Sequence, residues 1–526
     1  MNAGQKWLFS LDSGCPKVAL RVFVRKKPNK SGVVSIQVIR KSQGKYTVVK
    51  TIGSSKDPHQ IQAFITQGEH YVSSLVKQSK INFEVESERA VIDLFFKGID
   101  SIQLVGPELL LGRLFDEIGF NKIKGELFRS LVITRLVYPV SKLKTTDYLF
   151  KYTGSIIDVE RIYRYLDRLN GKYKEQVQQI SYAHTLKILN DQMSVVFYDV
   201  TTLYFEIEDE DDLRKTGFSK EGKHQHPQIV LGLLVSVDGY PLAYEVFEGK
   251  KFEGHTMLPV VEAFRKKYQL QDLTIIADAG LLSNDNMEEL QQKKYNYILG
   301  ARIKNETNVL KQKILGLSLS DGQRVLLEKD STQKLIVSYS TKRAKKDAAN
   351  RRKGLEKLER NIANGKLTKQ HINNRGYNKY LKMDGVINIA IDYEKYKADS
   401  KWDGLKGYVT NTRMGKDQVI ESYGHLWKIE KAFRISKTDL RIRPIYHRLR
   451  KRIEAHLCIA FCAYKIYKEL ERQLKEKEAG LSPEKAIDIL KTIYQITIIT
   501  PYSKQKESRL YLPNSEQQNL LKLFTI

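Results

Sequence analysis

The stretch that decides the fold is MSVVFYDVTTLYFEI, residues 193–207, a run rich in β-branched and aromatic residues with an aspartate, Asp199, in its middle. This composition predicts a strand that is buried in a sheet. A charged side chain inside a buried strand is costly unless it is paired or bound to a metal ion. Asp199 is therefore the first candidate for a functional residue.

The following residues predict two more strands and then alternating helices and strands. PQIVLGLLVSVDGYPLAYEVFEGK (227–250) has Asp-Gly between two apolar runs, which predicts a hairpin. An amphipathic helix (256–269), the short strand LTIIADAG (273–280), a helix (283–294) and the strand YNYILGARI (295–303) come next. The predicted order is β–β–β–α–β–α–β. This is the order of an α/β RNase H-like core, a mixed sheet flanked by helices.

A second aspartate, Asp278, ends the predicted strand LTIIADAG. In an RNase H-like order the first and fourth strands lie side by side, so we expect Asp199 and Asp278 to face each other at the end of the sheet, where metals and ligands gather. Two carboxylates supply too few oxygen ligands for a pair of Mg²⁺ ions. A third carboxylate is expected from a later helix, and Glu430 is the candidate.

Glu430 lies in the basic stretch ESYGHLWKIEKAFRISKTDL (421–440), on an expected helix with an apolar stripe that includes Leu426. One interpretation is a surface carboxylate that forms an i,i+4 ion pair with Arg434. The other is a metal ligand on a DNA-binding face, because a residue beside the apolar stripe can point to the sheet edge.

The spacing of Tyr423, Leu426, Glu430 and Lys437 resembles the Tyr-x2-Arg-x3-Glu-x6-Lys signature of a large branch of bacterial insertion-sequence DDE transposases. Leu426 stands where that family usually has Arg. The stretches FYDVTTLYFE, EVFEGKKFEGHTM, IADAGLLSNDN and GYVTNT also resemble the family, in the same order. The resemblance covers roughly residues 100–470.

The resemblance implies that Asp199, Asp278 and Glu430 are the catalytic triad and the metal ligands. The implied cofactor is Mg²⁺, as two ions, with Mn²⁺ as a possible substitute. Because Leu426 cannot donate a hydrogen bond to a phosphate, that contact is either lost or supplied by a neighbouring basic residue such as Lys428, Lys431 or Arg434. The expected DNA-binding residues are Tyr423, Lys428, Lys431, Arg434 and Lys437.

The implied function is that of a transposase that binds the terminal inverted repeats of an insertion sequence and carries out metal-dependent DNA cleavage and strand transfer. The expected partners are double-stranded DNA, as transposon ends and target, and a second copy of the chain in a synaptic complex. Two alternatives stay open: a nuclease of the same fold without strand transfer, and a non-catalytic DNA-binding descendant, which the Leu426 departure keeps in play.

Composition agrees with a nucleic-acid partner. The 526 residues include 89 Lys+Arg and 61 Asp+Glu, a net charge of +28, and a protein this basic usually binds a polyanion. No apolar run reaches the length of a membrane helix, so no membrane association is expected. Three cysteines and no evident signal peptide favour a reducing compartment. The expected location is the bacterial cytoplasm, in association with the nucleoid.

The expected domain organisation follows the changes in pattern along the chain. Residues 341–380 hold 13 Lys/Arg and 3 acids, which favours an arm that contacts phosphates over a solvated helix. The predicted parts are a β-meander plus helix (1–95), a helical, DNA-binding region (96–190), the catalytic core (191–302 and 386–473), an inserted β-rich subdomain with the basic arm (303–385) and a helical tail (474–526).

Overall fold

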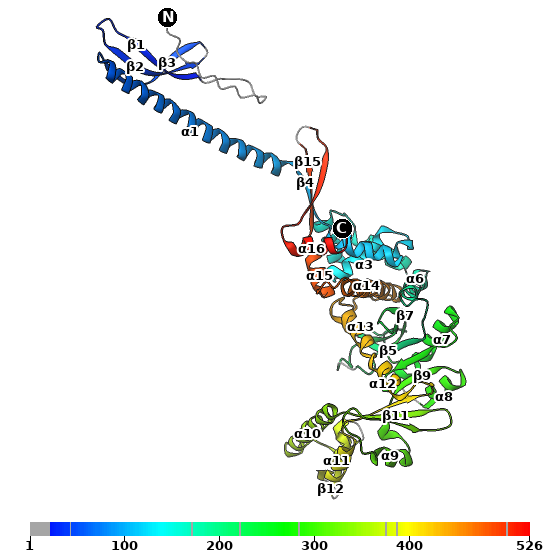
Figure 1. Cartoon of the computed structure of the whole chain (residues 1–526). Helices are drawn as coiled ribbons and strands as arrows, with labels where there is room; N and C mark the ends of the chain where they lie inside the picture. Colours follow the sequence, from blue (N-terminus) through cyan, green and yellow to red (C-terminus); the bar gives the residue numbers. More distant parts are fainter. Residues whose placement is uncertain are drawn as a thin grey trace. The chain divides into compact units, whose positions relative to one another are not determined.

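The computed structural model describes residues 21–42, 44–169, 172–219, 222–281, 284–373, 376–384, 388–500 and 503–526. The chain divides into two compact units, Met1–Ser101 with Ile496–Arg509, and Ile102–Gln495 with Leu510–Ile526. Each unit is built from its own helices and strands (Figure 1).

The first unit is built on an antiparallel meander and one long helix. The strands pair in the order β1-β2-β3, as the alternating sequence predicts. The helix α1 starts at Pro58, after an Asp57 side chain that accepts a hydrogen bond from the His59 amide at 2.9 Å. It ends at Gly98, three residues beyond the expected end of this part of the chain at residue 95. The elements are β1 (Arg21–Pro28), β2 (Val34–Ser42), β3 (Lys45–Ser55) and α1 (Pro58–Gly98).

The second unit contains an eight-stranded mixed sheet with the order β10-β11-β14-β9-β8-β5-β6-β7. Five of these strands lie in the order β7-β6-β5-β8-β9, so the first and fourth predicted strands, β5 and β8, are neighbours as expected. β5, β8 and β9 pair in parallel, and β6 is antiparallel to β5 and β7. The bounds are β5 (Val195–Tyr204), β6 (Gln228–Ser236), β7 (Pro241–Glu248), β8 (Thr274–Ala277), β9 (Asn296–Ala301), β10 (Arg324–Glu328), β11 (Lys334–Tyr339) and β14 (Leu405–Thr410).

Separate apolar cores lie on the two faces of this sheet. One face packs against α7 (Met257–Tyr268) and α8 (Asn284–Gln292). The other packs against α13 (Trp427–Thr438) and α14 (Arg450–Glu476), and this core continues into the helical region. The helix α12 (Lys416–Gly424) connects β14 to α13. The sheet is therefore covered on both sides, as the apolar character of its strands requires.

The helical region predicted before the core is present, and α14 passes through it in contact with α2, α3, α5 and α6 (Figure 1). Its elements are η1 (Glu108–Gly112), α2 (Arg113–Ile118), η2 (Phe120–Lys122), α3 (Glu126–Val137), α4 (Lys142–Tyr148), η3 (Leu149–Thr153), α5 (Val159–Leu169) and α6 (Lys172–Ile188).

The strands of the insertion between β9 and β14 belong to two different sheets. β10 and β11 join the main sheet through β14. The basic arm is the 23-residue helix α10, which lies with α11 and a small hairpin (Figure 1). The further elements are η6 (Ile303–Asn305), α9 (Asn308–Leu315), α10 (Thr341–Ala363), η7 (Lys369–His371), η8 (Gly376–Tyr380), β12 (Leu381–Asp384), β13 (Asn388–Ile391), α11 (Tyr393–Asp399) and η9 (Ser400–Trp402).

The tail differs from the helical expectation, because it also contains two strands. The β-branched run around Thr497 and Ile498 favours a strand, and β15 and β16 form a small sheet with β4 in the order β16-β15-β4. The elements are β4 (Ile99–Leu104), α15 (Pro483–Leu490), β15 (Tyr494–Ile499), β16 (Lys506–Tyr511) and α16 (Ser515–Leu523). None of the helices in the described residues combines the length and the apolar character that crossing a bilayer requires.

Candidate active site

The parallel pairing of β5 and β8 brings the two predicted aspartates together. The register pairs Val195 with Thr274 and ends with Tyr198 opposite Ala277. Asp199 and Asp278 are the next residues on the two strands. The two aspartates, 79 positions apart in the sequence, therefore lie at neighbouring positions on adjacent strands.

Both aspartates belong to the sheet face that α13 covers. Side chains alternate along a strand, so Asp199 shares its face with Phe197, and Asp278 continues the face of Ile276. Phe197 and Ile276 belong to the same core as Ile429 of α13. α13 also contacts β5 directly. The middle of β5, the end of β8 and one helix thus meet on this face.

Glu430 lies in the first turn of α13, where a negative charge is favoured by the helix dipole. The chain does not run as one helix through this stretch: α12 ends at Gly424 and α13 begins at Trp427. Leu426, in the break, is only 7 % exposed and packs in the core, which suits its apolar side chain. In the described part of the chain, Glu430 is exposed and forms no ion pair with Arg434.

Tyr423 is buried beside Asp278 and donates a hydrogen bond to its Oδ1 at 3.1 Å. Burial raises the pKa of Tyr423, and the negative charges of Asp278 and, more weakly, Glu430 raise it further. The phenol therefore stays protonated and remains a donor. A Cβ on Gly300, in the adjacent β9, would lie 2.6 Å from the Tyr423 oxygen, so the tyrosine fits only because this residue is glycine.

Lys406 of β14 is a site residue that the sequence reasoning missed. Its Nζ lies 4.5 Å from the centroid of the Tyr423 ring. Burial lowers the pKa of Lys406, and the charge of Arg343 lowers it further, whereas Asp278 and Glu430 act in the opposite direction. The charges of Asp278 and Glu430 therefore both act on this lysine.

Glu253, in the short turn η4 (Glu253–His255), was also missed. A Cβ on Gly280, in η5 (Ala279–Leu281), would lie 3.8 Å from Glu253 Oε2 and 4.0 Å from Asp278 Oδ2. The two carboxylates therefore flank the same glycine. The available signal was the stretch EVFEGKKFEGHTM, whose resemblance to the family was noted without assigning a role to its glutamates.

The donor set fits a hard divalent cation, because carboxylate oxygens are the ligands that Mg²⁺ prefers. Within the described residues, no three His, Cys, Asp or Glu side chains are gathered closely enough to hold a metal ion.

The predicted DNA-binding lysines and arginine lie on α13 in different environments. Lys428 Nζ donates to the Val237 carbonyl at 2.5 Å and lies 3.6 Å from Asp238. Lys431 forms an ion pair with Glu471 of α14. Arg434 is exposed, and Lys437 is half-buried. Two of the four cations therefore already have carboxylate partners within the chain.

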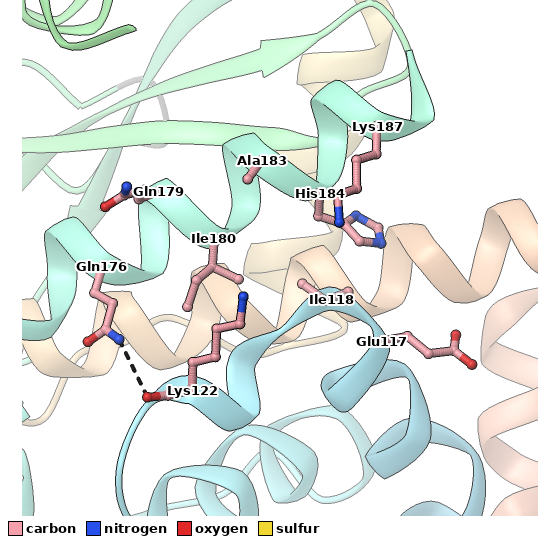
Figure 2. Close-up of a pocket in the computed structure, with 9 residues that line it drawn as sticks. All are labelled: Glu117, Ile118, Lys122, Gln176, Gln179, Ile180, Ala183, His184 and Lys187. Carbon is pink, nitrogen blue, oxygen red and sulfur yellow. Dashed lines mark hydrogen bonds between the residues drawn. The ribbon is translucent and has the colours of Figure 1, made fainter. Parts of the chain in front are cut away.

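A cavity of about 300 Å³ lies in the helical region, between α2 and η2 on one side and α6 on the other. Figure 2 shows Lys122, Gln176, His184 and Lys187 around it, with the Gln176 amide bonded to the Lys122 carbonyl. None of the predicted catalytic carboxylates lines this cavity. It is a feature of the helical region and not of the carboxylate centre.

None of the curated proteins compared with the chain matches it. The chain is similar to the piggyBac transposase in its synaptic complex with hairpin DNA, at 11% identity over 74% of this chain and 79% of that chain, with a TM-score of 0.37. It is also similar to the Mos1 transposase in its paired-end complex with the left transposon end, at 13% identity over 36% of this chain and 56% of that chain, with a TM-score of 0.15.

The family described as the transposase DDE domain matches residues 190–466, which is more than half of the chain. The matched residues begin just before β5 and end within α14, so they include both strand aspartates and Glu430. The chain belongs to the family of transposases with a DDE domain.

Proposed function

We propose that this protein binds the terminal inverted repeats of an insertion sequence and catalyses their cleavage and strand transfer, with Asp199, Asp278 and Glu430 as catalytic residues. The observation that carries the proposal is the meeting of the middle of β5 and the end of β8 on the face covered by α13. In a chain of this family, that arrangement supplies three carboxylates from the three elements expected to carry them.

The side chains of the site prepare it for phosphoryl transfer. Tyr423 holds Asp278 by Oδ1, so that Oδ2, on the Gly280 side, is directed toward the centre. The main-chain amide of Val200 donates to Asp199 Oδ1 at 2.8 Å, which restrains this carboxylate in turn. Mg²⁺ bound by the three carboxylates would supply a Lewis acid that makes the attacking oxygen nucleophilic and stabilises the charge on the phosphate.

The basic residues would hold the DNA backbone next to this centre. Arg434 is exposed on the helix that carries Glu430, and we assign it a phosphate contact, together with Tyr423 and Lys437 by resemblance. Lys428 and Lys431 must give up Asp238 and Glu471 to make such contacts. The basic helix α10 is a second candidate surface, since a polyanion gains most from a dense row of cations.

Cleavage and joining require two DNA ends held together, so we propose a homodimer in a synaptic complex as the active assembly. The two alternatives make different predictions. A nuclease of the same fold would cut the end without joining it to a target. A non-catalytic descendant would bind DNA and leave it intact.

The test incubates the full chain with Mg²⁺, a duplex that carries the inverted repeat flanking its own gene, and a target plasmid. Asp278→Asn removes one carboxylate charge from the centre, and Asp272→Asn is the matched control, because Asp272 is exposed in the loop before β8. Joined products that disappear with Asp278→Asn but persist with Asp272→Asn support the proposal. Cutting without joining points to the nuclease, and binding without cutting, unchanged by Asp278→Asn, would overturn both enzymatic functions.

A further inference from the structure

A cluster of buried basic side chains lies outside the carboxylate centre. Arg135 from α3 is 5 % exposed, Lys142 from α4 is 4 % exposed, and His456 from α14 is 6 % exposed. Arginine and lysine side chains are almost never this buried without a partner of opposite charge. Their positions on three different helices show that the fold brings them together, since no local sequence spacing does so.

His447 is the fourth basic residue of the cluster. The four side chains are in contact or lie close enough for their charges to interact. Arg135 Nη2 lies 3.5 Å from His456 Nδ1, and the rings of His447 and His456 are 5.5 Å apart between centroids. Burial lowers the pKa of His447 to about 4, and the charges of Lys142, Arg135 and Arg452 also lower it. Burial likewise lowers the pKa of His456, with Arg135, Lys142 and His447 acting in the same direction.

No carboxylate of the described residues forms an ion pair with Arg135 or Lys142. Asp167, whose partner Arg452 acts on His447, is already bonded to Arg452 and Lys451. Arg135 Nε is buried without a hydrogen-bond partner, and Arg135 Nη1 reaches the Leu440 carbonyl only at 3.5 Å. The side-chain ammonium of Lys142 has no hydrogen bond to any described residue. The cluster therefore keeps donors and positive charge that the chain does not satisfy.

Buried positive charge without compensation is costly, and an anion that enters the cluster would remove that cost. Guanidinium, ammonium and imidazole groups together are well suited to phosphate oxygens. We propose that Arg135, Lys142, His447 and His456 bind one phosphate group of a DNA strand. The inference rests on the proposed function, because DNA is the source of that phosphate.

The site is linked to the catalytic helix by the segment that follows it. α13 ends at Thr438, and the carbonyls of Leu440 and Ile442 receive contacts from Arg135 and from His456 Nε2, the latter at 3.1 Å. A phosphate held by the cluster thus holds DNA next to residues that anchor the end of the helix carrying Glu430.

The experiment compares Lys142→Met with Lys144→Met, because Lys144 is exposed on the same helix. For the wild type, inorganic phosphate should raise the thermal unfolding temperature above its value in chloride at equal ionic strength. Lys142→Met should raise the unfolding temperature in chloride, abolish the extra effect of phosphate, and weaken binding of the end-bearing duplex about tenfold. Lys144→Met should keep the phosphate effect and bind DNA within about twofold of the wild type.

If Lys142→Met does not fold, a second measurement still tests the proposed site. Binding of phosphate at pH 6 should be accompanied by proton uptake, measured by calorimetry in buffers of different ionisation enthalpy, and His447→Asn should reduce this uptake. Equal phosphate effects and equal DNA affinity in wild type and Lys142→Met, or binding without proton uptake, would overturn the site. If the wild type shows these effects but never cleaves DNA, the proposed function fails while the phosphate site stands.

Discussion

Tyr423 and Asp278, 145 positions apart, are joined by a hydrogen bond of 3.1 Å from the phenol to Oδ1 of the carboxylate. The bond ties α12 to the residue that follows β8, so it fixes the side-chain direction of one catalytic carboxylate from outside its own strand.

Tyr423→Phe should lower the rate of end cleavage by about 10–100-fold, because a hydrogen bond to a charged group contributes about 1.5–3 kcal/mol. The measurement is single-turnover cleavage at saturating DNA. Tyr408→Phe is the matched control, since Tyr408 packs against Tyr423 with ring centroids 4.9 Å apart. Equal rates for wild type and Tyr423→Phe would show that the bond does not orient Asp278.

Gly300→Ala should reproduce the defect of Tyr423→Phe, because the added Cβ would lie 2.6 Å from the Tyr423 oxygen and 3.0 Å from the Ala279 amide nitrogen. The phenol must then move away from Asp278. In a double-mutant cycle of cleavage rates, the two changes should be clearly less than additive. Full additivity would mean that Gly300 acts on the site by another route.

Lys406→Met should raise the affinity of the site for Mn²⁺ by about tenfold, because it removes a positive charge that acts on Asp278 and Glu430. Mn²⁺ binding can be titrated directly by electron paramagnetic resonance, independently of cleavage. Lys401→Met, an exposed lysine shortly before β14, serves as control. An unchanged Mn²⁺ affinity for Lys406→Met would separate this lysine from the metal centre.

Acidification should destabilise the protein between pH 6.5 and about 4 through its buried histidines. Burial lowers the pKa of His447 and of His184 to about 4 in the fold, against about 6.5 in the unfolded chain. Between these values the unfolded chain binds more protons, so the contribution is complete above pH 6.5 and is lost as the pH falls.

Each of these histidines should account for up to about 3 kcal/mol of the loss. Urea unfolding at pH 7 and pH 5 measures the part of this loss of unfolding free energy that falls between the two pH values. His447→Asn should reduce the difference in unfolding free energy between the two pH values, whereas His255→Asn, at an exposed position, should leave it unchanged. A His447→Asn protein with the wild-type pH dependence would contradict this assignment.

The central sheet could be predicted because its signals are local. The Asp-Gly turn sets the hairpin of β6 and β7, and the apolar run around Asp199 can be accommodated only in a strand buried on both faces. The strands β15 and β16 were missed, since the tail was assigned from its helical segments although the β-branched run 496–499 was present. β10 and β11 extend the main sheet because β11 pairs with β14. No local sequence pattern reveals this pairing.

The candidate residues Asp199, Asp278 and Glu430 could be selected from the sequence because the two aspartates interrupt apolar strand patterns and Glu430 lies beside an apolar stripe. Lys406 and Glu253 could not, because a lysine in a strand and a glutamate in a turn become site residues only through packing. The resemblance gave Tyr423 a phosphate contact, whereas its burial against Asp278 indicates a positioning role, and the two roles remain separable by the Tyr423→Phe experiment.

The pairing of β10 and β11 beyond β14 has a consequence for the solubility of the protein. Without them, β14 would present a row of open main-chain donors and acceptors, which invites strands from other molecules to add on. The insertion moves the open edge to β10, a strand of five residues that α12 contacts, and short or covered edge strands resist such pairing. A shortened chain that joins β9 directly to β14 should lose this protection even if its carboxylates are all retained.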